Sequence, residues 1–127
     1  MKVEYCSYTN TIFILFDNKT IKCYDLSPRD LKEGQPCTGK FVAGNLLLWE
    51  ETLKYQPQSI TCHPFACTLV IIYTGFIRFH NYNNKLLYSP FLVTTLKNCK
   101  LAQYSPLGDK LILATSGAIV VANSYTY

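Results

Sequence analysis

The sequence predicts an all-β fold of about three WD-repeat-like β-propeller blades that do not complete a ring. Three observations predict it. The chain repeats itself, each copy holds short apolar segments separated by turn residues, and each copy is about as long as one blade. At 127 residues the chain is too short for the roughly four to eight blades of a closed propeller. An ordinary β-sandwich with coincidental spacing is the alternative fold.

The repeat becomes visible when residues 60–81 are shifted along the chain. A shift of 42 positions toward the C-terminus places Leu69 on Leu111, and a shift of 56 positions toward the N-terminus places it on Phe13. The second shift also places Cys62 on Cys6. Neither shift needs an insertion, so the sequence contains three copies of one unit.

Each copy is expected to form three strands, because its apolar runs are rich in β-branched and aromatic residues and are bounded by turn residues. The first strands are expected at residues 5–7, 59–63 and 100–105. The second strands are expected at 11–16, 68–73 and 110–115. The third strands are expected at 20–24, 76–80 and 118–122.

A fourth strand is expected after the first two copies. Residues 85–96 supply one, and Pro90 should place it at an exposed edge or interrupt it. After the first copy, a loop insert at 26–39 rich in Pro and Gly leads into residues 40–49. The expected organisation is one partial propeller over residues 1–127, with blade 1 at about 1–49, blade 2 at about 58–96 and blade 3 at about 99–127, the last lacking its outer strand.

Such an arc would leave sheet edges and apolar faces unpaired at both ends. The sequence therefore predicts a piece of a longer chain or a polypeptide that partner chains complete. The alternative is an unusual compact monomer of three sheets.

Composition narrows the class of function. The net charge of +4 is mild, charged residues are 16% of the chain and Lys and Arg are not clustered, which argues against nucleic-acid binding. No apolar stretch reaches the length of a membrane span, and the polar N-terminus lacks the apolar core of a secretory signal. We expect a cytoplasmic protein whose six cysteines are reduced and mostly buried.

The densest group of reactive side chains is Cys62, His63 and Cys67. It keeps open a metal-dependent or thiol enzyme as a less favoured alternative. Neighbouring strand residues point to opposite faces, however, and both histidines occupy repeat positions held by other residue types in the other copies. Glycine-rich phosphate loops are also absent from the sequence. The sequence therefore predicts a non-enzyme without catalytic residues, cofactors or metal.

Protein binding is the expected role, because propellers present loops and sheet edges to partners. For Trp49 the competing interpretation is core packing, and for the two strand cations it is the solvated side of a strand. The candidate partner-binding residues lie in and beside the insert or share one repeat position: Arg29, Lys32, Lys40, Trp49, Lys22 and Arg78.

The C-terminal part of the chain carries a more specific pattern. IRFHN, a spacer and KNCKLAQYSPLGDKLILATSGAIVV resemble the amino-terminal propellers of cilia- and flagella-associated WD-repeat proteins. Those propellers carry an Arg-x-x-Asn blade end, here Arg78 and Asn81, and a basic-x-Cys opening, here Lys97 and Cys99. The resemblance covers about 50 of the 127 residues. The Trp-Asp dipeptides and the hydrogen-bonded tetrad of WD repeats are degraded, and Tyr24-Asp25 is the nearest match.

The resemblance implies a non-catalytic scaffold of the ciliary axoneme, which helps attach dynein arms or regulatory complexes to doublet microtubules. It implies a cytoskeletal location and axonemal protein partners, with tubulin as a further candidate because its acidic surface suits a mildly cationic chain. An adaptor propeller of a trafficking or ubiquitin-linked complex is the alternative among binding proteins.

Overall fold

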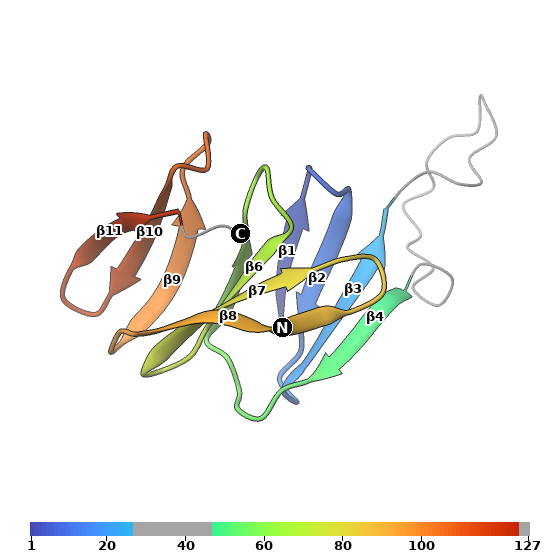
Figure 1. The fold of residues 1–127 in the computed structure, drawn as a ribbon. Coiled ribbons are helices and arrows are strands. Elements are labelled where there is room, and N and C mark those ends of the chain that lie inside the picture. Colours follow the sequence, from blue (N-terminus) through green and yellow to red (C-terminus); the bar gives the residue numbers. More distant parts are fainter. Residues whose placement is uncertain (27–46, 125–127) are drawn as a thin grey trace.

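The structure is a computed structural model that describes residues 1–26 and 47–124 (Figure 1). These residues form 11 strands in three separate antiparallel sheets. Blade 1 consists of β1 (Lys2–Cys6), β2 (Thr11–Leu15), β3 (Thr20–Asp25) and β4 (Leu47–Thr52). Blade 2 consists of β5 (Ser59–Cys62), β6 (Thr68–Ile72), β7 (Phe76–Tyr82) and β8 (Leu87–Thr95). Blade 3 consists of β9 (Cys99–Tyr104), β10 (Lys110–Thr115) and β11 (Ile119–Asn123).

The predicted all-β, propeller-like architecture is confirmed, and the sandwich alternative is wrong. Each sheet follows the chain order of its strands, and blade 2 packs against a neighbour on each face. Figure 1 shows the three sheets side by side, with the first strands β1, β5 and β9 on the inner side of the arc. No closed barrel forms within the described ranges.

The outer strands differ most from the prediction. In blade 1 the fourth strand was expected at 40–49; residues 40–46 lie outside the described residues, and β4 covers 47–49 and continues to Thr52. The predicted insert at 26–39 lies outside the described residues, apart from Leu26. Pro90 lies in β8, the edge strand of its sheet, where the pairing register shifts opposite His80. This position tolerates proline because an edge strand leaves one row of backbone donors unpaired.

The register of the repeat also corrects the sequence alignment. Blades 2 and 3 are related by a shift of 42 residues. In blade 1, however, the β2–β3 hairpin is one residue longer than the β6–β7 hairpin, since Leu15 pairs with Ile21 whereas Ile72 pairs with Ile77. Phe13 therefore corresponds to Val70 and not to Leu69. A one-residue slip moves every side chain to the other face of a strand, so the gapless alignment reversed the faces of β2.

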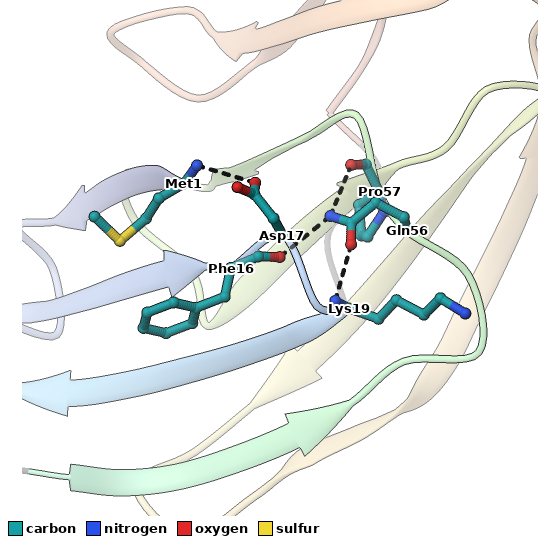
Figure 2. A network of polar contacts seen from close by, with 6 residues as sticks. All are labelled: Met1, Phe16, Asp17, Lys19, Gln56 and Pro57. Atoms are coloured by element: carbon teal, nitrogen blue, oxygen red, sulfur yellow. Dashed lines mark hydrogen bonds and ion pairs between the residues drawn. The ribbon is translucent and has the colours of Figure 1, made fainter.

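The extra residue in this hairpin is held by Gln56, from the connection between β4 and β5 (Figure 2). The Gln56 side chain accepts a hydrogen bond from Lys19 N at 2.8 Å and donates one to Phe16 O at 3.2 Å. Lys19 has a φ of 68°, a left-handed conformation that widens the turn. The Met1 amino group lies 3.1 Å from Asp17 in the same turn. The link between blades 1 and 2 is thereby fixed to the hairpin that sets the register.

Two apolar cores join the blades. We call the face that a blade turns toward the next blade in the chain its forward face, and the opposite one its rear face. The forward face of blade 1, with Phe13 and Ile21, packs on the rear face of blade 2, with Leu69 and Ile71. The forward face of blade 2 packs on the rear face of blade 3 in the same way, through the following residues: Val70, Ile72, Ile77, Phe79, Leu111 and Leu113. Burial of apolar surface in these junctions is the main source of stability.

Candidate protein-interaction surface

Three equivalent hairpins lie side by side at one end of the arc, as Figure 1 shows for the β1–β2, β5–β6 and β9–β10 turns. We call this end the hairpin face and define it by residues 7–10, 64–67 and 106–109. In the corrected register, Tyr8, Phe65 and Leu107 occupy the same position of the three turns. Their exposed fractions are 56%, 58% and 78%. Each blade thus presents one large apolar side chain to solvent on the same face.

His63 holds two of these hairpins together. Its Nδ1 accepts a hydrogen bond from Phe65 N at 2.9 Å, so the proton of the neutral ring belongs on Nε2. Nε2 then donates to the backbone oxygen of Gly108 at 2.7 Å, and the Ser124 hydroxyl lies 3.1 Å from the same nitrogen. The buried His63 ring also packs edge-on against the Tyr104 ring, with the two ring centres 4.7 Å apart. The hairpins of blades 2 and 3 are therefore locked relative to each other.

A small hollow lies at the base of the hairpin face. It has a volume of about 170 Å³ and is lined by all three inner strands and their turns, with Glu4, Cys62 and Gln103 among its walls. Glu4 accepts a hydrogen bond from the Thr61 hydroxyl at 3.2 Å, and burial raises the pKa of the Glu4 carboxyl. The end of the arc therefore combines exposed apolar tips with a recessed carboxyl group that can accept hydrogen bonds.

Two thiols meet beside this hollow, where β1 contacts β5. Cys6 donates to the His63 backbone oxygen at 3.8 Å, and Cys62 donates to the Tyr5 backbone oxygen at 3.5 Å. The neighbouring Cys62 thiol lowers the pKa of Cys6, and the same interaction together with burial raises the pKa of Cys62. Both side chains are buried, which limits the access of reagents to Cys6.

The structure does not bring Cys62, His63 and Cys67 together as one reactive group. Cys62 points toward blade 1 and the His63 ring toward blade 3, because consecutive residues at a strand end face opposite ways. Cys67 lines a different cavity, of about 330 Å³. Among residues 1–26 and 47–124, no group of three His, Cys, Asp or Glu side chains lies close enough to hold a metal ion.

The residues predicted to bind partners are dispersed. Arg29, Lys32 and Lys40 lie outside the described residues. Trp49 is buried between blades 1 and 2, where its indole N–H donates to Asn83 O at 3.0 Å and its ring lies 6.0 Å from that of Phe13. The tryptophan thus stabilises a blade junction.

Lys22 and Arg78 share a repeat position but have different surroundings. The Lys22 ammonium lies 3.9 Å from Glu50 and 5.3 Å from the centre of the Phe16 ring. The Arg78 guanidinium lies over the rings of Tyr73 and Phe76, at 5.4 Å and 5.0 Å. Both cations are therefore engaged with neighbours on their own blade, and neither belongs to the hairpin face.

Sequence reasoning missed the three apolar tips that the fold brings together. The gapless alignment placed Phe65 on Thr9, so the coincidence with Tyr8 was hidden. The available signal was hairpin length: matching the β1–β2 and β5–β6 turns separately aligns Tyr8 with Phe65 and, 42 positions later, with Leu107.

His80 gives a testable pH dependence of stability. Its Nδ1–H donates to Tyr88 O at 2.8 Å, while Nε2 is buried without a hydrogen-bond partner among the described residues. Burial lowers the pKa of His80, and the positive charge of Arg78 adds to this effect. Below about pH 6.5 the unfolded chain binds a proton that the folded chain resists. We expect the free energy of unfolding to fall with pH in that range, by up to about 1.4 kcal/mol per pH unit from this group.

Urea denaturation of wild type and His80→Gln between about pH 7.5 and 5.5 checks this expectation. The difference between the two proteins isolates His80 from the carboxyl groups that also titrate. It should shrink steadily as the pH falls, and a difference that is constant with pH would contradict the assignment.

Comparison of the chain with protein-family models and with curated proteins finds no match.

Within the described residues, no helix is long and apolar enough to cross a membrane.

Proposed function

We propose that the chain is a non-catalytic scaffold module that binds other proteins through its hairpin face. The observation that carries the proposal is the presence of three equivalent, exposed apolar side chains, Tyr8, Phe65 and Leu107, on adjacent hairpins. Single exposed apolar residues are common on soluble proteins, but a grouped set on one face marks an interaction site.

The rest of the site supports the same function. The His63 hydrogen bonds hold two of the hairpins rigidly, which lowers the ordering cost when a partner binds. The hollow behind them offers the Glu4 carboxyl as an acceptor for a donor group of the partner. Apolar anchors around a recessed polar group are typical of protein-binding surfaces.

The cellular setting that we propose is the ciliary axoneme. This proposal is supported by the resemblance of residues 77–127 to cilia-associated propellers. The resemblance rests on Arg78, Asn81, Lys97 and Cys99. In this role the module would help attach dynein arms or regulatory complexes to doublet microtubules. The net charge of +4 favours acidic partners, with tubulin among the candidates.

A triple variant tests the proposal: Tyr8→Ser, Phe65→Ser and Leu107→Ser combined. The full chain and the variant are used to recover proteins from extracts of ciliated cells. We expect the variant to lose bound axonemal protein by about tenfold or more, because each exposed anchor contributes on the order of 1 kcal/mol to binding. Its thermal midpoint should stay near that of the wild type, since all three side chains are exposed.

Val93→Ser is the matched control. Val93 lies on β8 with an exposed fraction of 54%, away from the hairpin face, so this variant should bind like the wild type. Equal recovery by the triple variant would overturn the role of the hairpin face. Recovery of partners that include no axonemal component would overturn the ciliary setting.

A further inference from the structure

Among residues 1–26 and 47–124, none covers the forward face of blade 3. Its residue Ile119 corresponds to Ile77 on the forward face of blade 2, since the two blades are related by a shift of 42 residues. Ile77 is 1% exposed and lies in the junction with blade 3, whereas Ile119 is 74% exposed. Val121, which corresponds to the buried Phe79, is likewise exposed. Blade 3 therefore presents the apolar half of a blade junction without its other half.

The rear face of blade 1 is likewise not covered by any part of the chain that the structure describes. Val3 is 54% exposed, although its counterpart Ile60 on blade 2 is buried in the junction with blade 1. Tyr5, the counterpart of the buried Cys62, is also exposed. The chain thus has one free rear face in addition to one free forward face.

Both internal junctions follow one rule, in which a forward face packs on the rear face of the next blade. The face that blade 3 lacks is a rear face, and blade 1 presents one. We propose that a second copy of this chain covers both free faces: blade 1 of each copy packs on blade 3 of the other. Two arcs of three blades then close into a six-bladed ring, within the roughly four to eight blades of known propellers.

Both faces carry exposed apolar side chains, and the forward face of blade 3 also carries Lys110, the counterpart of the buried Thr68. Ile112, Ile119 and Val121 on one face and Val3 and Tyr5 on the other are apolar or aromatic, as in the two internal junctions. Lys22 on the rear face of blade 1 is already paired with Glu50, so no isolated charge from this position is buried. The two new junctions are equal by twofold symmetry, and neither copy keeps a free face.

This inference does not rest on the hairpin-face proposal, but the two together have a consequence for partner binding. A ring of two copies would carry six apolar tips around one axis, so a partner with two binding segments would gain avidity.

Native mass measured by sedimentation of the full chain tests the inference. We expect a mass of two copies at micromolar concentration. Ile119→Glu on one face and Val3→Glu on the other should each weaken association by about 100-fold or more, because each buries an unpaired carboxylate in both junctions of the ring. Val93→Glu is the matched control, as Val93 has the same exposed fraction as Val3 and lies on neither face; it should remain a dimer.

Mixing the two variants gives a sharper result. Alone, each should be monomeric, but together one junction is intact, between the forward face of the Val3→Glu chain and the rear face of the Ile119→Glu chain. The mixture should therefore form a 1:1 dimer that is weaker than the wild type. A monomeric wild type, or a Val3→Glu variant that dimerises normally, would overturn the inference. The triple serine variant of the hairpin face should still dimerise, so failure of either proposal can be recognised separately.

Discussion

Replacing Gly108 with alanine is expected to lower the free energy of unfolding by about 2–4 kcal/mol, through backbone strain and overpacking together. Gly108 has a φ of 74°, which L-residues with a side chain rarely adopt. A Cβ atom there would lie 2.5 Å from His63 Cε1 and 2.6 Å from Nε2. The ring cannot move aside without losing its hydrogen bonds to Phe65 N and Gly108 O.

Chemical denaturation of Gly108→Ala, beside Gly75→Ala as a control, measures this effect. A Cβ on Gly75 meets no atom within 4 Å and its φ lies outside the left-handed region, so that variant should change stability by less than about 1 kcal/mol. Equal stability of the two variants would mean that the His63 ring does not hold the hairpins together. If Gly108→Ala still folds, the displaced hairpin should also weaken partner binding in the pull-down from ciliated cells.

The strands were predictable where local chemistry determines them. In β2, β6 and β10, β-branched and aliphatic runs stand between turn residues, and the structure keeps them within one residue of the expected bounds. The outer strand β4 continues to Thr52, beyond the expected end at residue 49, and only Trp49 of its six residues is buried. Edge strands are stabilised by few side-chain contacts, so their sequences say less about where they end.

The candidate site was hidden by a backbone detail. The extra residue in the β2–β3 hairpin is accommodated by a left-handed Lys19 and by the Gln56 side chain, and neither residue type signals such a turn. An alignment that leaves no gap for that residue pairs Cys6 with Cys62 and obscures the match between Tyr8 and Phe65. Contacts such as that of His63 with Gly108 join residues 45 positions apart. They depend on how the blades pack, which a repeat pattern alone does not determine.

Isoleucine occupies the same repeat position in blades 2 and 3, as Ile77 and Ile119, and replacing each of them tests the blade junctions most directly. Ile77→Ala should lower the free energy of unfolding by about 2–5 kcal/mol, because it leaves a cavity between blades 2 and 3. Ile119→Ala removes the same atoms from the exposed forward face of blade 3, so in dilute solution it should change stability by no more than about 0.5 kcal/mol.

Protein concentration separates the two variants further. The loss from Ile77→Ala belongs to each chain and should not depend on concentration. The loss from Ile119→Ala should grow as the concentration rises, because a second copy that covers this face stabilises the folded chain by mass action. Thermal or urea unfolding at several concentrations gives both trends. If the stability loss from Ile119→Ala does not change with protein concentration, the forward face of blade 3 stays free. If Ile77→Ala costs much less than about 2 kcal/mol, the junction between blades 2 and 3 is not tightly packed.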